Sequence, residues 1–113
     1  MLKKFGLLAV LLASINVVHA ADNYGAIAFN SGTYAYGFAY DHKTQADANQ
    51  RALSECGRGC KVVLELMNEC GAIYRNNSRY AWSNGRSRQA AENGARNQCG
   101  SNCKLVAWSC TTR

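Results

Sequence analysis

A repeat with a period of 43 residues constrains the fold of this chain more than any other feature of its sequence. Residues 44–63 read TQADANQRALSECGRGCKVV, and residues 87–106 read SRQAAENGARNQCGSNCKLV. The aligned pairs are Cys56 with Cys99, Gly57 with Gly100, Cys60 with Cys103 and Lys61 with Lys104, and a third cysteine follows each copy, at Cys70 and Cys110. We therefore predict one supersecondary unit used twice, over about residues 24–70 and 71–110, and cross-linked by cysteines.

The first 20 residues predict export. Lys3 and Lys4 precede an apolar run at residues 5–18, and Ala20 follows it where a signal peptidase cleaves. A membrane anchor is the alternative, but this run is shorter than the roughly 20 apolar residues that cross a bilayer. Residues 1–20 are expected to be a cleaved signal peptide. Residues 21–113 are then a single periplasmic or extracellular domain with no membrane span.

The cysteines predict disulfides rather than a metal site. All six lie in residues 21–113. An even number in a small exported domain is typical of disulfides, because a domain of this size buries only a modest core. A zinc site is the alternative, but Cys-x3-Cys is not the usual zinc spacing and no histidine is near the thiols. We expect three disulfides, no metal and no cofactor.

The first repeat begins with a predicted hairpin. Residues 24–29 and 34–40 have strand patterns, and the turn between them contains Gly32, which can take a positive φ. The second strand alternates strictly, so its large aromatic side chains share one face: Tyr34, Tyr36, Phe38 and Tyr40.

A helix and a third strand complete the repeat. The helix is expected to begin after the N-cap Thr44 and to end at Gly57, and a strand is expected over residues 60–70, with Val62, Leu64 and Leu66 on one face. The second repeat has the same order, with Ser87 as the N-cap and a last strand at residues 103–110. The small residues along the two helices are Ala48, Ala52 and Cys56 in one, and Ala91, Ala95 and Cys99 in the other.

The predicted fold class is therefore α+β. Two strand–strand–helix–strand repeats, related by a pseudo-two-fold axis, are expected to share one mainly antiparallel sheet with both helices on one face. The alanine stripes should let the helices lie close to the sheet. The geometry favours the pairs Cys56–Cys60, Cys99–Cys103 and Cys70–Cys110, with the last pair joining the halves. Pairing Cys56 with Cys103 and Cys60 with Cys99 is the alternative.

The chain resembles a known family. YGAIA at residues 24–28, the cysteine–glycine pair at residues 56–57, CKVV at residues 60–63 and NECGA at residues 68–72 are similar to the family of small secreted bacterial domains called domain of unknown function 4189. The resemblance covers nearly all of residues 21–113. It implies export and disulfides, and it implies no catalytic residue.

The charged residues give weak candidates for catalysis. Without Lys3 and Lys4 the chain has 11 basic and seven acidic residues, a net charge of +4 that is scattered along the sequence. His42 beside Asp41 could act as a general base, but a solvated loop histidine is the ordinary outcome. Glu65 and Glu69 share a strand face, as the two carboxylates of a glycosidase do, although a solvated face is the usual explanation.

The aromatic residues give a stronger candidate for binding. Tyr80 and Trp82 occupy the strand that matches the aromatic row of the first half, and Trp108 is expected on the face away from Leu105 and Ala107. Arginines accompany them, and rings with guanidinium groups suit docking to a sugar or a protein. Burial of the rings in the core is the alternative. The candidate binding surface consists of Tyr34, Tyr36, Tyr40, Tyr80, Trp82, Trp108, Arg75, Arg79 and Arg86.

These observations favour a non-enzymatic, exported binding module held rigid by disulfides, such as an inhibitor, an immunity protein, a secreted effector or an adhesion accessory. Its partner would be a protein or a cell-wall ligand, since no nucleic-acid motif is present. A small secreted hydrolase of cell-wall glycan or RNA and a structural envelope protein are the alternatives.

Overall fold

The computed structural model describes residues 23–111, so the predicted signal peptide lies outside the described residues. Within this range the first half of the chain contains β1 (Tyr24–Phe29), β2 (Tyr36–His42), α2 (Gln45–Cys56) and β3 (Lys61–Met67). The second half contains β4 (Cys70–Arg75), β5 (Tyr80–Gly85), α3 (Arg88–Cys99) and β6 (Lys104–Cys110). Neither helix in the described range is long and apolar enough to cross a membrane.

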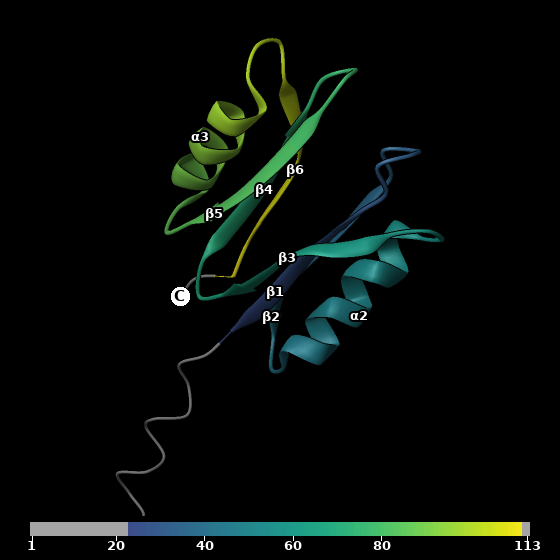
Figure 1. Cartoon of the computed structure of the whole chain (residues 1–113). Coiled ribbons are helices and arrows are strands. Elements are labelled where there is room, and N and C mark those ends of the chain that lie inside the picture. The colour runs from purple at the N-terminus through teal and green to yellow at the C-terminus, as the bar shows by residue number, and fades with distance from the viewer. Residues whose placement is uncertain (1–22, 112–113) are drawn as a thin grey trace, which may run out of the picture.

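The α+β class, the antiparallel pairing and the order of elements are confirmed, but the strands form two sheets rather than one. The sheet orders are β2-β1-β3 and β5-β4-β6, with the first strand of each half in the centre. The helices lie on opposite outer sides and the sheets face each other between them (Figure 1). The pseudo-two-fold axis stays a prediction.

Three apolar layers explain the two-sheet arrangement. One lies between α2 and its sheet and contains Ala28 and Ala52, and a second lies between α3 and its sheet and contains Ala72 and Ala95. The third lies between the sheets, where Ile27, Phe29 and Ile73 are buried together. The central strands therefore carry apolar residues on both faces, and a sheet with helices on one face would leave the other set in water.

The helix ends have the geometry expected from the sequence. Thr44 and Ser87 have extended backbones, and their hydroxyl groups accept hydrogen bonds from Asp47 N and Ala90 N. Gly57 and Gly100 take φ values of 98° and 95°, a region that favours glycine. The two predicted alanine and cysteine stripes are buried, as expected for helices that lie close to a sheet.

Removing one cap should therefore weaken the domain measurably. We expect Ser87→Ala to lower the free energy of unfolding by about 1 kcal/mol, because Ala90 N loses its acceptor at the start of α3. Urea unfolding followed by circular dichroism measures this change. The exposed Ser101, which precedes no helix, offers the control Ser101→Ala, and equal losses in both variants would contradict the capping role.

The strand expected over residues 60–70 is two strands. β3 ends at Met67, and Asn68 takes a φ of 55° before β4 begins at Cys70. Asn68 N donates to Asn23 O and Asn68 Oδ1 accepts from Asn23 N, each at 3.0 Å. The chain thus turns from one sheet into the other at Asn68, and Cys70 belongs to the second half.

The second strand of the first hairpin begins at Tyr36 rather than at Tyr34. Asn30 Oδ1 accepts hydrogen bonds from Gly32 N and Thr33 N and so organises a longer turn. Tyr34, rather than Gly32, takes the positive φ, at 68°. Tyr34 is therefore a turn residue, and the aromatic residues in β2 are Tyr36, Phe38 and Tyr40.

Each half contains a bulge in its last strand, and the bulges change the predicted faces. The pairing of β3 with β1 shifts by one residue at Val63, and the pairing of β6 with β4 shifts by one residue at Val106. These two extra residues are 43 positions apart, like the repeat. Val62 therefore packs on the α2 side, whereas Leu64 lies between the sheets. Leu105 and Trp108 pair with Tyr74 and Ala72, so they share the α3 face instead of lying on opposite faces as predicted.

The disulfides have the pairing favoured by the sequence: Cys56–Cys60, Cys70–Cys110 and Cys99–Cys103. Two of them close the short loops between a helix and the next strand. The expectation that Cys70–Cys110 joins the halves is wrong, because Cys70 and Cys110 lie opposite each other in neighbouring strands of the second sheet. This bridge fixes β6 to β4.

Candidate functional site

A groove lies between β2 of one sheet and β6 of the other. It consists of two adjoining hollows, each of about 500 Å³. Both are lined by Tyr36, Leu105 and Val106, so they form one continuous groove. We call the part near β2 and the end of β6 the aromatic end, and the part near the β4–β5 turn the basic end.

The aromatic end presents large side chains to solvent. Tyr36, Tyr40 and Trp108 expose 45%, 54% and 38% of their surfaces, and Leu105 exposes 37%. Phe38 lies between them and is half-buried against the core between the sheets. The guanidinium of Arg88, at the start of α3, lies 4.0 Å from the Trp108 ring centre and holds this ring in place.

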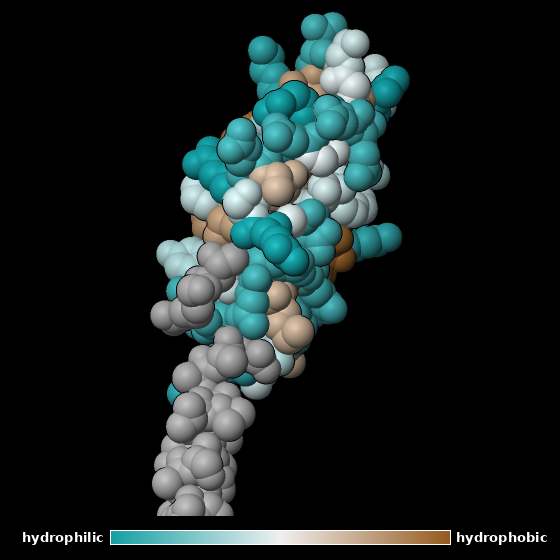
Figure 2. Space-filling model, turned by 90° about the vertical axis from the view of Figure 1, so that its left-hand side faces the viewer, coloured by the Kyte–Doolittle hydropathy of each residue, from teal (hydrophilic) through white to brown (hydrophobic). Residues whose placement is uncertain are grey.

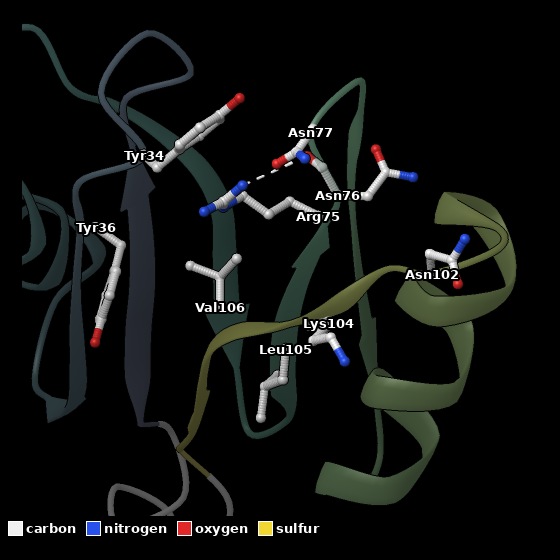
Figure 3. Close-up of a pocket in the computed structure, with 9 residues that line it drawn as sticks. All are labelled: Tyr34, Tyr36, Arg75, Asn76, Asn77, Asn102, Lys104, Leu105 and Val106. Carbon is white, nitrogen blue, oxygen red and sulfur yellow. Dashed lines mark hydrogen bonds between the residues drawn. The ribbon is translucent and has the colours of Figure 1, made fainter.

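The basic end combines two cations with three side-chain amides. Arg75 and Lys104 line it together with Asn76, Asn77 and Asn102. Figure 3 shows Arg75 extending across the hollow toward Tyr34, and its guanidinium lies 3.7 Å from the centre of that ring. Tyr34, the turn residue with a φ of 68°, thus contributes its ring to this end through a cation–π contact.

The predicted aromatic surface is divided between two places. Tyr80 and Trp82 lie on the opposite side of the sandwich, where β3 faces β5, and line a smaller hollow of about 180 Å³. Their ring centres are 5.5 Å apart, and Tyr80 is 5.3 Å from Phe29. Phe38 and Trp82 pack against the core, as the core alternative expects, whereas the exposed rings Tyr36, Tyr40 and Trp108 gather in the groove. Their role in binding stays a prediction.

Two of the predicted arginines are not in the groove. Arg79 donates a hydrogen bond to the carbonyl oxygen of Cys99 at 2.9 Å, so it joins the β4–β5 turn to the end of α3. Arg86 is exposed in the turn between β5 and α3 and lines neither hollow. Figure 2 shows the side where α3 lies, and hydrophilic residues dominate it, with only small separate apolar areas.

The candidates for catalysis are not brought together. Glu65 accepts a hydrogen bond from Asn49 of α2 at 2.7 Å, whereas Glu69 accepts one from Asn84 of β5 at 3.1 Å. The two carboxylates therefore belong to different halves, and the expectation that they share one strand face is wrong because β3 ends before Glu69. His42 lies at the end of β2 in a separate hollow of about 280 Å³.

A comparison with protein families places the chain. The family described as "Domain of unknown function (DUF4189)" matches residues 24–110, which include both helices and all six strands. The chain belongs to this family. The resemblance carried by YGAIA and the cysteine pattern is thereby confirmed.

Relatives of this DUF4189 domain occur in mycobacteria. The chain is 40% identical over 89 residues to the uncharacterized protein Rv1813c of Mycobacterium tuberculosis, covering 78% of this chain and 60% of that protein. It is 35% identical over 92 residues to the protein Rv1269c of the same species, covering 81% and 73%. The chain thus spans about 60% of the length of the first relatives it matches.

A solved structure supports the fold of the DUF4189 domain. The NMR structure of Rv1813c from Mycobacterium tuberculosis superimposes with a TM-score of 0.65 at 36% identity, over 79% of this chain and 75% of that one. The comparisons thus give the fold and the family but no ligand.

Sequence reasoning identified Trp108 of β6 but missed the contribution of Lys104, Leu105 and Val106 to the groove of this DUF4189 domain. These three residues line the groove and also belong to the repeated segment 87–106. The repeat pattern predicted only that they form part of a strand. The sequence offered one signal for this part of the groove: the cation Lys104 lies next to the apolar Leu105, and at a sheet edge both side chains would be exposed.

Proposed function

We propose that this domain is an exported, non-enzymatic binding module, and that the groove between β2 and β6 binds a protein or a cell-wall ligand. One observation carries the proposal: three exposed aromatic rings and Leu105 gather along one groove of the described chain. Tyrosine and tryptophan supply large contact areas at a low cost in conformational entropy, and binding sites concentrate them.

The framework around the groove supports the same proposal. The described residues contain three disulfides and no free cysteine. Cys70–Cys110 lies at one end of the groove and fixes its β6 wall. A rigid wall loses little entropy when a ligand binds, so more of the contact energy becomes affinity.

Binding to isolated cell-wall sacculi and to envelope proteins of the producing cell tests the proposal. The oxidised domain, residues 21–113, should bind one of these two preparations, and the variant Tyr36→Ala/Trp108→Ala should lose about tenfold or more in affinity, because both rings leave the groove. Tyr80→Ala is the matched control, since Tyr80 is an exposed tyrosine outside the groove. An equal loss in the control, or no binding to either preparation, contradicts the proposal.

A second variant separates a binder from a hydrolase. Replacing His42, Glu65 and Glu69 with alanine, glutamine and glutamine should leave the binding unchanged, because none of them lines the groove. Release of soluble glycan or nucleotide by the wild type, lost in this variant, would instead identify an enzyme.

A further inference from the structure

The backbone of β6 itself forms one wall of the groove. Six consecutive residues, 105–110, line the aromatic end. Because successive side chains of a strand point to opposite faces, an uninterrupted run of this kind means that the edge of the strand faces the hollow. In the described chain β6 has one strand neighbour, β4, so this edge is unpaired.

The pairing of β6 with β4 identifies which backbone groups face the groove. Thr111 N donates to Glu69 O at 2.9 Å, so Thr111 and Glu69 form a hydrogen-bonded pair. Hydrogen-bonded and non-bonded pairs alternate along an antiparallel ladder. The N–H and C=O groups of Cys110 and Trp108 therefore point away from β4 and toward the groove.

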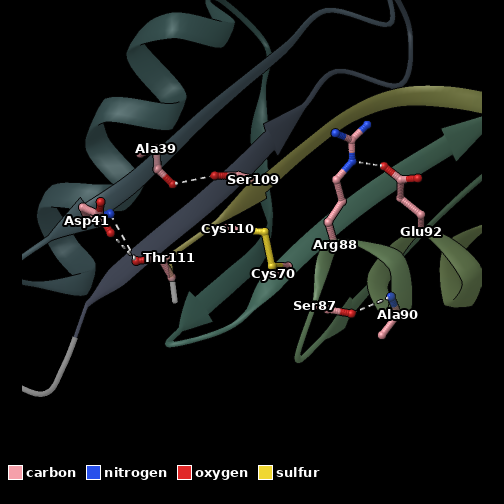
Figure 4. The surroundings of a disulfide bond; sticks show 10 residues. All are labelled: Ala39, Asp41, Cys70, Ser87, Arg88, Ala90, Glu92, Ser109, Cys110 and Thr111. Carbon is pink, nitrogen blue, oxygen red and sulfur yellow. Dashed lines mark hydrogen bonds and ion pairs between the residues drawn. A yellow bond between two sulfur atoms is a disulfide. The ribbon is translucent and has the colours of Figure 1, made fainter. Parts of the chain in front are cut away.

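One end of this edge is held against the other sheet. Ser109 Oγ donates to Ala39 O at 3.2 Å, and Asp41 N donates to Thr111 Oγ1 at 3.1 Å. Figure 4 shows these two bonds beside the Cys70–Cys110 disulfide. Since the two bonds and the disulfide fix the end of β6, its edge is ordered before a ligand arrives.

The aromatic side of the groove has the spacing of an extended peptide. Tyr36, Phe38 and Tyr40 follow each other at every second position of β2. The ring centres of Phe38 and Tyr40 are 6.4 Å apart. Alternate residues of an extended chain repeat at about 6.6 Å, so consecutive side chains on one face of such a peptide can each meet a ring.

The basic end favours a negatively charged group in its ligand. Arg75 and Lys104 lie there, and no aspartate or glutamate lines either hollow. The ion pairs within residues 23–111 involve neither of these two cations. A second copy that docked through its own groove would bring the same cations, so charge disfavours this pairing and favours a ligand with a carboxylate.

Resting on the proposed function, we infer that the ligand is an extended peptide of a partner protein, which pairs with the free edge of β6 and places a carboxylate between Arg75 and Lys104. Strand addition supplies backbone hydrogen bonds, and pockets for alternate side chains supply specificity. A glycan would use the rings and cations but not the strand edge, and the exposed backbone of β6 therefore favours the peptide.

Selection from random octapeptides displayed on bacteriophage tests this inference with the oxidised domain. Enriched peptides should alternate apolar residues with others and carry an acidic residue near one end. A synthetic enriched peptide should bind Arg75→Ala/Lys104→Ala about tenfold or more weakly than the wild type, because charge-assisted hydrogen bonds are lost. Arg86→Ala is the matched control, since it removes a cation outside the groove, and binding to it should be unchanged.

Methylation of the peptide backbone tests strand addition directly. Methyl groups on the alternate amides that face β6 should abolish binding, whereas methyl groups on the other amides should not, because only the first set donates to the strand edge. Failure to enrich any peptide, equal effects of both methylation patterns, or a dimer through β6 in sedimentation without peptide would each overturn the inference. If sacculi still bind in a manner that needs Tyr36 and Trp108, the proposed function stands and the occupant is a glycan.

Discussion

Replacing Cys70 and Cys110 together with alanine is expected to lower the free energy of unfolding by about 4 kcal/mol. The bridge closes a loop between residues 40 positions apart, and a cross-link reduces the entropy of the unfolded chain more as its loop becomes longer. Urea unfolding of the oxidised protein, followed by the fluorescence of Trp82 and Trp108, measures the loss.

The bridge between Cys56 and Cys60 provides the control for this prediction. It spans a sequence separation of only 4, so the same argument gives a loss of about 2 kcal/mol for Cys56→Ala/Cys60→Ala. The two variants remove equal numbers of sulfur atoms and differ in loop length and place. If both lose the same amount, the long loop is not what makes Cys70–Cys110 important.

The local features of this fold could be predicted from the sequence because each has a short-range physical cause. Thr44 and Ser87 cap helices since a hydroxyl can reach a backbone N–H within the first turn. Gly57 and Gly100 end helices at a positive φ that other residues rarely adopt. The duplicated pattern doubled the strength of each of these signals, and it also led to the correct pairing of the cysteines.

The first hairpin turns of the two halves share a hydrogen-bond pattern that was not predicted from the sequence. Asn30 Nδ2 donates to Arg58 O and Asn76 Nδ2 donates to Ser101 O, so each half ties its first hairpin to the loop after its helix. Both asparagines also accept hydrogen bonds from the backbone of their own turn. The alignment of residues 44–63 with residues 87–106 includes Arg58 and Ser101 but neither asparagine, which is why the equivalence of the two contacts was not expected.

The two-sheet arrangement could not be predicted, because it depends on contacts between the halves. Alternation along β2 shows which side chains share a face but does not show what covers that face. Phe38 is half-buried because it lies over the core between the sheets, whereas Tyr36 and Tyr40, two residues to either side, are exposed. Ser109 Oγ of β6 donates to Ala39 O, so β6 meets β2 next to Phe38.

The bulge at Val106 explains why the groove escaped prediction. An extra residue in a strand moves every later side chain to the other face. Here it places Leu105 on the face of Trp108, at the edge beside the aromatic row, whereas strict alternation put these two residues on opposite faces. An alternating pattern with a period of two cannot reveal a bulge, since Val63 and Val106 are apolar residues that fit the strand pattern whether or not they are bulged.

A methyl group at one glycine should separate α2 from its sheet. We expect Gly37→Ala to lower the free energy of unfolding by about 3 kcal/mol. A β-carbon at Gly37 would lie 2.5 Å from Cys56 N and closer still to the carbonyl oxygen of Ala52. These are backbone atoms of α2, which cannot rotate aside as a side chain can, so the helix itself must move.

Comparison with the second half shows why this loss of stability is expected at Gly37 and not at the corresponding position. Gly37 lies opposite Ala28, whereas the corresponding pair in the second sheet is Ala81 opposite Tyr74, so larger residues separate α3 from its sheet. Gly32→Ala is the control, because a β-carbon there would meet only Asn30 Oδ1, at 3.3 Å, in an exposed turn. Urea unfolding should show a loss of about 1 kcal/mol or less for this control. Equal stability of Gly37→Ala and the wild type would mean that α2 does not lie against β2, and the small-residue stripe would then lose its role in setting the distance between helix and sheet.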